Sequence, residues 1–402
     1  ALVLPENTTD PTYTWSLVPE ELANISSDGL FIAIDTGTVT VIATANDESG
    51  VTGSTDITIT EKPVSSIKIT GSEEIIIYPN PVLDGHFTIR GMEKDQAAPY
   101  AGLTPDTVLN AVDSAGLVTD GRQLALNSYE NRVFQVGLDD GRFVVVKFYR
   151  PGRWTDDQIL EEHAFTAELA ELEVPAVPAL ELDGSTLHAF EGFRFTVFPR
   201  SGGRAPNLDD PGVREWLGRF LGRIHAVGAV RPFTHRPALD VETFGVEPRR
   251  FLIDHAWLPS ELAGVYEGVS QQSLEGVARC YERAGDVKRL RLHGDCHEGN
   301  VLWTDSPGNT GPHFVDFDDS RTGPAVQDLW MLLGADRDEQ TERLSDMLLG
   351  YEDFAEFDRR ELHLVEALRT LRLLHYSAWI ARRWDDPAFP SAFPWFNTQR
   401  YW

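Results

Sequence analysis

Leu290-Arg-Leu-His-Gly-Asp-Cys-His-Glu-Gly-Asn-Val-Leu-Trp303 holds the most informative residues of this chain. Its polar middle stands between two apolar stretches, which predicts a loop held between strands. A second segment, His313-Phe-Val-Asp-Phe-Asp-Asp319, follows after a short hairpin and places Asp316 at the end of an apolar strand. We therefore expect two carboxylates, Asp295 and Asp316, and the amide of Asn300 to lie close together.

These three side chains match the needs of phosphoryl transfer. That reaction requires a carboxylate to orient the acceptor hydroxyl, oxygen ligands for magnesium and a cation on the nucleotide phosphates. Asp295 and Asn300 are separated by four residues, the spacing of the catalytic aspartate and metal-binding asparagine in a kinase loop. Asp316 can supply magnesium with a second hard oxygen ligand. A His-Gly-Asp loop or an Asp-x-Asp turn is common structural chemistry by itself, but their combination predicts an ATP- and Mg²⁺-dependent phosphotransferase.

The composition narrows the class of partner. The 402 residues have a formal net charge of −28; residues 1–91 carry 13 Asp/Glu and 3 Lys/Arg, and the remainder 50 and 32. Nucleic acids and anionic membranes bind clustered Lys and Arg, so neither is expected as a partner. No apolar run of about 18 residues predicts a membrane span, and no signal peptide is evident. Cys280 and Cys296 are expected to be free thiols in the cytoplasm.

The composition changes near residue 91. Residues 12–17, 30–34, 38–44 and 54–60 alternate β-branched residues between turn signals, which predicts a small all-β sandwich over residues 1–62. This segment resembles bacterial immunoglobulin-like repeats, and the linker 63–91 resembles the start of a secretion sorting domain. We interpret residues 1–91 as a fusion without a catalytic role; a natural adhesion module is the alternative.

After Met92 the pattern becomes α+β. Strands are predicted over residues 142–149 and 193–198, and helices over residues 105–115, 155–172, from Pro211 onward and 361–384. The sheet-rich segment 92–199 and the helical segment 200–402 have the outline of the N-lobe and C-lobe of a kinase.

Several motifs resemble a known family. His293-Gly-Asp-Cys-His-Glu-Gly-Asn300 and Asp316 resemble the aminoglycoside phosphotransferase and choline kinase superfamily, which has an atypical two-lobed protein-kinase-like fold. More narrowly, the chain resembles the RdoA-type stress response kinases A of bacteria at residues 126–133, 146–151, 158–163, 323–330 and 386–390. This resemblance implies a cytoplasmic, ATP-dependent Ser/Thr protein kinase of the stress response.

The resemblance also implies roles for individual residues. Asp295 corresponds to the proton acceptor, while Asn300 and the catalytic Asp316 correspond to the magnesium ligands. No G-x-G-x-x-G loop is present; residues 127–131 stand in its place, and Ser128 is expected to contact ATP. Phe198 begins the expected hinge between the lobes, whose backbone would meet the adenine.

Lys147 stands in a Val-Val-Val-Lys strand, where a lysine would contact the α- and β-phosphates. We expect an acidic residue of the next helix as its partner. Glu162 is preferred over Glu161 because Phe165 and Leu169 follow it at plus three and plus seven.

Other residues near the loop have structural interpretations. Asp328 is expected to brace the catalytic loop. His293 and His297 flank Asp295, and a metal site there would lack an evident third ligand, so hydrogen bonds within the loop are expected instead. Cys296 is expected to pack in the core, with redox sensing as the alternative.

Three functions remain open from the sequence. The leading hypothesis is a monomeric protein kinase that phosphorylates Ser/Thr hydroxyls, including its own. The second is a small-molecule kinase acting on an aminoglycoside-, choline- or homoserine-like hydroxyl. The third is a nucleotide-binding adhesion module. A pocket lined by carboxylates would favour a cationic small molecule, and a broad groove would favour a protein.

Overall fold

The computed structural model describes residues 13–19, 22–25, 31–33, 37–46, 52–59, 99–306, 309–334, 336–398 and 400–402. The chain divides into two compact units, Ala1–Gln96 and Ala97–Trp402. The boundaries predicted at residues 62 and 91 lie outside the described residues. None of the described helices is both long enough and apolar enough to span a membrane.

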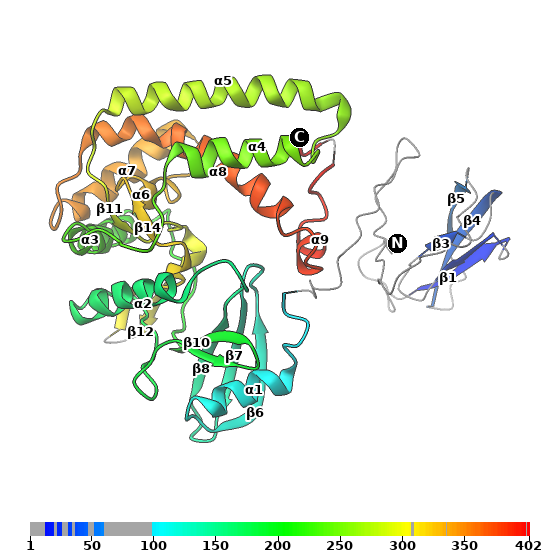
Figure 1. Ribbon diagram of the computed structural model, residues 1–402, viewed down its shortest axis with the longest axis horizontal. Coiled ribbons are helices and arrows are strands. Elements are labelled where there is room, and N and C mark those ends of the chain that lie inside the picture. The colour runs from blue at the N-terminus through cyan, green and yellow to red at the C-terminus, as the bar shows by residue number, and fades with distance from the viewer. Residues whose placement is uncertain are drawn as a thin grey trace. The chain divides into compact units, whose positions relative to one another are not determined.

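The first unit consists of short antiparallel strands (Figure 1). They are β1 (Tyr13–Val18), β2 (Ala23–Ile25), β3 (Phe31–Ala33), β4 (Gly37–Ala45) and β5 (Thr52–Ile59). β4 lies between β1 and β5, and β2 pairs with β3. Val39 and Val41 of β4 are buried while Thr38 is exposed, the period-two alternation expected of a strand. The predicted strands are confirmed here, whereas the immunoglobulin-like relationship and the fusion stay predictions.

The second unit opens with a five-stranded antiparallel sheet in the order β6-β7-β8-β10-β9 (Figure 1). Its strands are β6 (Thr119–Leu126), β7 (Arg132–Leu138), β8 (Phe143–Phe148), β9 (His188–Phe190) and β10 (Phe193–Pro199). Helix α1 (Pro105–Ser114) packs on this sheet through Val108 and Val112, which share a core with Val146 and Phe195. Thr104 caps α1: its side-chain oxygen accepts a hydrogen bond from the backbone N–H of Thr107.

Helix α2 (Asp156–Glu171) connects the sheet to the helical lobe. Thr155 and Gln158 form a capping box at its N-terminus, which satisfies backbone N–H groups that the first turn leaves unpaired. Phe165 and Leu169 of α2 are fully buried in the core of the helical lobe. One face of α2 is therefore fixed inward, as the sequence periodicity predicted.

The helical lobe contains α3 (Pro211–Gly228), α4 (Glu247–Asp254), α5 (Ser260–Ala284), α6 (Gln327–Trp330), α7 (Arg337–Tyr351), α8 (Val365–Ala381) and α9 (Ala388–Ala392). A π-helix (Glu242–Val246) precedes α4. The single helix predicted over residues 361–384 is wrong at both ends: a 3-10 helix (Arg359–Leu364) precedes α8, and α8 ends at Ala381. Glu361, inside that 3-10 helix, accepts a hydrogen bond from the backbone of Val326.

Two small antiparallel pairs hold the polar loops of the helical lobe. β11 (Leu290–Leu292) pairs with β14 (Arg321–Gly323), and β12 (Val301–Ser306) pairs with β13 (Asn309–Phe314). In the second pair Val301 lies opposite Phe314. The residues just before β12 and just after β13 therefore emerge at the same end of the hairpin.

Candidate active site

The loop between β11 and β12 is held from beneath by Asp328. Its carboxylate accepts hydrogen bonds from the backbone N–H groups of His293 and Gly294, both at 2.8 Å, and lies 3.1 Å from Nε2 of His225. Burial acts to raise the pKa of Asp328, but these hydrogen bonds and the two histidines outweigh it and lower the pKa. Asp328 therefore braces the loop that carries Asp295, and does so as a carboxylate, which confirms the expected bracing role.

Gly294 allows the loop to lie against the segment that follows Asp316. Its φ is +88°, and a Cβ atom at this position would lie 2.1 Å from the carbonyl oxygen of Asp319. A side chain here would meet both backbone strain and a fixed backbone atom. Glycine at this position brings the two acidic segments of the site into contact.

Asp295 projects from the braced loop into a cavity. Its side chain is 22% exposed, and Oδ1 accepts a hydrogen bond from Nη1 of Arg372 at 2.6 Å. The side-chain amide of Asn300 donates to the backbone oxygen of Asp295 at 3.0 Å. That bond uses the nitrogen of the amide and leaves its oxygen as the group suited to a cation.

The β12–β13 hairpin brings Asp316 to the same cavity. The backbone N–H of Val315 donates to the carbonyl of Asn300 at 3.1 Å, so the two segments are adjacent. Asp316 has a left-handed backbone, with φ of 59°, and its side chain is 52% exposed. Non-glycine residues in this conformation are uncommon and concentrate at functional sites.

Lys147, on the sheet of the first lobe, reaches across to these carboxylates. Its Nζ lies 2.9 Å from Oδ1 of Asp316 and 3.9 Å from Oδ1 of Asp318. Burial disfavours the charged amine, but Asp316 and Asp318 outweigh burial and raise the pKa of Lys147 well above its usual value. Lys147 is therefore a buried cation between the two lobes.

The structure separates the two glutamates considered as partners of Lys147. Glu161 accepts hydrogen bonds from the backbone N–H groups of residues 234–236 and so has a structural role. Glu162 is buried, lines the cavity and interacts electrostatically with Lys147. Among the described residues, however, no ion pair within 4.0 Å joins Glu162 to Lys147; the close carboxylate is that of Asp316.

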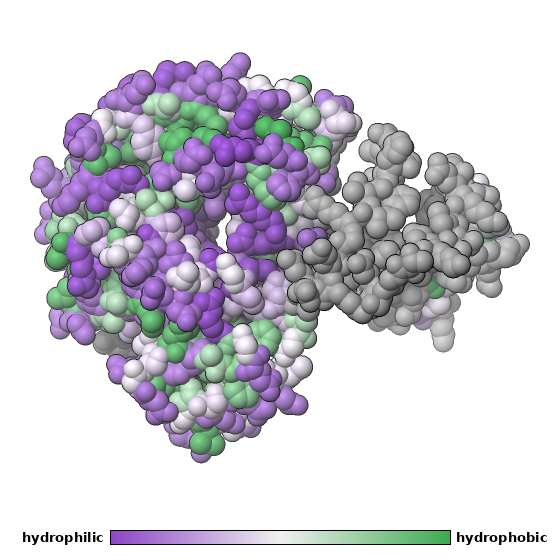
Figure 2. Space-filling model, viewed as in Figure 1, coloured by the Kyte–Doolittle hydropathy of each residue, from purple (hydrophilic) through white to green (hydrophobic). Residues whose placement is uncertain are grey.

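Ser128 and Phe198 line the same cavity from the first lobe. The Ser128 hydroxyl donates to the backbone oxygen of Asn131 at 2.9 Å, which closes the turn that replaces a glycine-rich loop. Phe198 lies at the end of β10, and Nζ of Lys147 is 5.5 Å from the centre of its ring. All seven residues predicted for the site therefore border one cavity of about 800 Å³. Figure 2 shows this face hollowed between the lobes, with hydrophilic residues around the hollow.

The histidines beside Asp295 take part in hydrogen bonds of the loop. His293 lies 2.9 Å from the carbonyl of Val315, and Nδ1 of His297 accepts from the backbone of Gly299. No group of three or more His, Cys, Asp or Glu side chains in the described part of the chain could hold a metal ion by itself. Cys296 is buried, and burial raises the pKa of its thiol well above the usual value, which opposes redox sensing.

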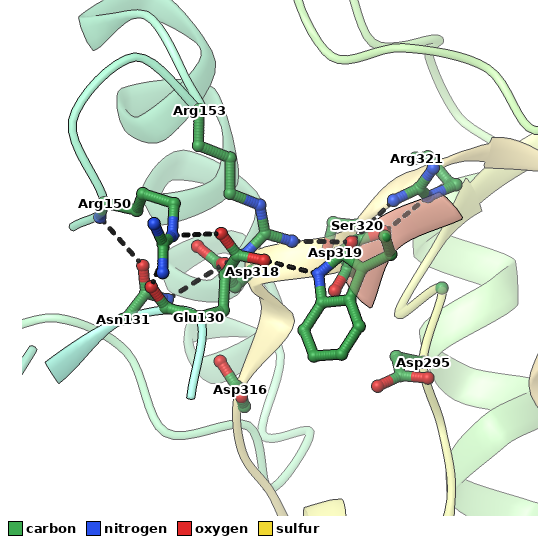
Figure 3. A network of polar contacts seen from close by, with 12 residues as sticks. Glu130, Asn131, Arg150, Arg153, Asp295, Asp316, Asp318, Asp319, Ser320 and Arg321 are labelled. Atoms are coloured by element: carbon green, nitrogen blue, oxygen red, sulfur yellow. Dashed lines mark hydrogen bonds and ion pairs between the residues drawn. The ribbon is translucent and has the colours of Figure 1, made fainter. Parts of the chain in front are cut away.

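A network of buried ions next to the cavity was not predicted from the sequence (Figure 3). Arg153 bridges Asp318 at 2.5 Å and Asp319 at 2.9 Å, joining the loop after β8 to the segment after Asp316. Asn131 also donates to Asp318 at 3.1 Å. These bonds hold the turn at residues 127–131 and the acidic segment in one arrangement.

Residues 379–386, near the C-terminus, also bind the turn at residues 127–131. Glu130 accepts a hydrogen bond from Nε1 of Trp379 and forms an ion pair with Arg383, each at 2.5 Å. Asp386 pairs with Arg150 at 2.5 Å and with Arg132 at 3.1 Å. We call this set of contacts, between residues 130–150 and residues 379–386, the C-terminal clasp. No local motif marks it, because its partners are separated by 236 to 254 positions.

Comparison with known proteins agrees with this geometry. Residues 122–365 match the phosphotransferase enzyme family. The chain belongs to this family. The phosphotransferase is 46% identical over 308 residues to the serine/threonine protein kinase RdoA of Salmonella typhimurium (strain LT2) and to stress response kinase A of Escherichia coli (strain K12). Each alignment covers 77% of the phosphotransferase and 92% of the relative.

Solved structures show the same fold at low identity. Amicoumacin kinase hAmiN superposes with a TM-score of 0.57 and 17% identity, over 74% of the phosphotransferase and 92% of that chain. A microcompartment-associated aminopropanol kinase superposes with a TM-score of 0.55 and 19% identity, over 71% and 94%. The two-lobed kinase-like fold expected from the sequence is thereby confirmed. A phosphotransferase of this fold moves a phosphoryl group from a nucleotide such as ATP to an acceptor hydroxyl.

Proposed function

We propose that the protein is an ATP- and magnesium-dependent Ser/Thr protein kinase of the bacterial stress response, active as a cytoplasmic monomer. The observation that carries the proposal is the convergence of Asp295, Asn300, Asp316 and Lys147 on one cavity between two lobes. The names of the relatives that are 46% identical support the protein substrate and the stress response.

The residues of the cavity fit a magnesium ion that is shared with a nucleotide. Mg²⁺ in kinases binds one or two protein oxygens together with phosphate oxygens and water, so the absence of a three-carboxylate cluster in the described residues is compatible with this ion. Asp316 is half exposed and already attracts a cation, the amine of Lys147. Asn300 and Asp316 would hold the metal, which would neutralise charge on the transferred phosphoryl group.

Asp295 is proposed to accept the proton of the substrate hydroxyl. Arg372 binds its Oδ1, and Nε2 of His297 lies 3.6 Å from its Oδ2, so Oδ2 is the oxygen proposed to take the proton. Lys147 is proposed to contact the nucleotide phosphates, with Glu162 as the acidic group behind it. Ser128 and the backbone of the turn at residues 127–131 would cover the phosphates, and Phe198 would border the adenine.

The proposal is tested by incubating the full chain with γ-labelled ATP, Mg²⁺ and a generic protein substrate, and by following label in the substrate and in the chain itself. Label on serine or threonine of either protein supports a protein kinase. Turnover of an aminoglycoside- or choline-like alcohol without any phosphoprotein would instead identify a small-molecule kinase. ATP binding without transfer to any acceptor would identify a nucleotide-binding module.

A further inference from the structure

Helix α8 and the turn after it form one wall of the cavity, next to Glu130 of the turn at residues 127–131, which Trp379 and Arg383 bind. Six of its side chains line the cavity: Arg372, His375, Tyr376, Trp379, Arg382 and Arg383. The first four follow at i, i+3, i+4 and i+7, so they share one face of the helix. We call these six residues the α8 wall.

The α8 wall carries positive charge and no carboxylate. Three of its six side chains are arginines, which stay charged at any physiological pH. His375 is neutral at pH 7, since burial and the neighbouring Arg321 lower its pKa to about 3. Tyr376 and Trp379 stack on each other, with ring centres 5.5 Å apart, and supply a flat apolar surface between the arginines. This local charge is opposite to that of the chain as a whole, which carries a net −28.

The three arginines differ in whether a carboxylate of the protein already pairs with them. Arg372 is paired with Asp295 and Arg383 with Glu130. Arg382 is exposed and lies 4.7 Å from the ring centre of Phe251, and within the described residues it makes no ion pair at 4.0 Å or less. Glu247 interacts with it electrostatically from beyond ion-pair distance, so Arg382 has no carboxylate in direct contact and can bind one that enters the cavity.

Carboxylates also line the cavity, but a lysine or arginine pairs with each of them except Glu162, so they attract a cationic acceptor less than their number suggests. A cationic acceptor is disfavoured next to the α8 wall. An aminoglycoside- or choline-like molecule would bring like charge against the arginines in a partly enclosed site, where such repulsion is costly. A carboxylate would instead receive charge-assisted hydrogen bonds, and the planar guanidinium group matches its geometry.

The position of Arg382 also indicates how far from the phosphorylated hydroxyl a substrate carboxylate would bind. Arg382 lies ten positions after Arg372, which contacts the proposed base, and this corresponds to about 15 Å along a helix. An extended peptide covers that length in about four residues. Because an arginine side chain is long and flexible, we expect the acidic residue of the substrate roughly two to five residues from the phosphorylated residue.

We propose that the acceptor is a peptide segment with acidic side chains two to five residues from the phosphorylated serine or threonine. This inference rests on the proposed protein kinase activity. Asp or Glu of the substrate pairs with Arg382, while the backbone near the hydroxyl lies over Tyr376 and Trp379. Arg382 is thus a residue that determines specificity and takes no part in the transfer of the phosphoryl group.

The test measures KM and kcat of the full chain on serine peptides that differ only in the flanking residues: Asp/Glu, Ala or Lys/Arg. We expect KM for the acidic peptide to be about 10-fold or more below that for the alanine peptide, the range of one charge-assisted hydrogen bond. Arg382→Glu should abolish this preference and lower KM for the basic peptide. Arg369→Glu is the matched control, because Arg369 lies on α8, pairs with Glu366 at 3.1 Å and does not line the cavity.

Three outcomes would overturn the inference, and they are distinguishable. If the wild-type chain labels peptides but prefers neutral or basic ones, the acidic specificity is wrong and the kinase activity stands. If Arg382→Glu and Arg369→Glu change the preference equally, Arg382 is not its source. If the chain phosphorylates a small anionic alcohol and no peptide or protein, both the peptide acceptor and the proposed function fail.

Discussion

Nζ of Lys147 and Oδ1 of Asp316 lie 2.9 Å apart, although the two residues come from different lobes and are 169 positions apart. The amine is 7% exposed and the carboxylate 52% exposed. The ion pair therefore joins a fixed cation to a carboxylate at the open cavity, where a nucleotide phosphate and a metal ion could each take one partner.

Lys147→Met is expected to lower kcat/KM for ATP by about 10²–10³-fold, the usual effect of removing one preorganised donor from a charged site. Methionine keeps much of the buried volume but cannot neutralise phosphate. Steady-state kinetics against ATP concentration measures this loss. Lys288→Met, at an exposed lysine outside the cavity, is the control, and equal activity of both variants would refute the role of Lys147.

Asp295→Asn is expected to bind ATP with near-normal affinity and to transfer phosphate about 10²–10⁴-fold more slowly, because the amide cannot accept the proton of the hydroxyl. Nucleotide binding by calorimetry and transfer by labelled ATP separate the two effects. Asp353→Asn, on the surface, should leave both unchanged. Normal transfer by Asp295→Asn would assign the base elsewhere.

Asp318→Asn is expected to destabilise the second unit by about 1.5–3 kcal/mol, because buried Arg153 loses the Asp318 carboxylate and keeps that of Asp319. Thermal unfolding of the full chain should show that transition several degrees lower. Asp305→Asn is the comparison, since the Asp305–Arg204 pair is exposed and should contribute nothing measurable. Equal melting temperatures of both variants would contradict a stabilising network.

Glu162 predicts a pH dependence of stability. Burial raises its pKa from 4.5 to about 7, although Lys147 and Arg236 partly oppose the change. The folded state therefore holds a proton that the unfolded state loses above about pH 4.5. The resulting stabilisation is present in full below that pH and disappears as the pH rises through about 7, a change of roughly 3 kcal/mol.

Glu162→Gln removes the titrating group, so the fall in melting temperature between pH 4.5 and 7 should be shallower in this variant. Glu361, whose pKa burial likewise raises to about 7, contributes in the same direction, and the double Gln variant should have the flattest profile. Glu356→Gln, at an exposed position, should follow the wild type. Identical profiles for Glu162→Gln and wild type would show that Glu162 titrates normally.

The local parts of the site could be predicted from the sequence. The positions of Asp295 and Asn300 depend on a four-residue spacing within one loop, and that of Asp316 on the end of an apolar strand. Helical periodicity favoured Glu162, but Phe165 and Leu169 also follow Glu161 at plus four and plus eight, on the same face. The contacts in the structure separate the two: Glu162 lines the cavity, and Glu161 binds the backbone of residues 234–236.

Contacts between distant segments could not be predicted in this way. Arg372 meets Asp295 across 77 positions, and Arg153 meets Asp318 across 165. An arginine on a helix or a loop has no local signal that distinguishes a buried ion pair from a solvated charge. For the same reason the sequence suggested a helical glutamate as the close partner of Lys147, whereas the nearest carboxylate belongs to Asp316.

The C-terminal clasp has a consequence for the order in which the enzyme matures. The turn at residues 127–131 is translated early, but Trp379, Arg383 and Asp386, which fix its surroundings, are added about 250 residues later. Domains can fold as they leave the ribosome, so the sheet of the first lobe can form while translation continues. The contacts of the clasp with this turn can form only after residues 379–386 have left the ribosome, so the surroundings of the turn are completed late in synthesis.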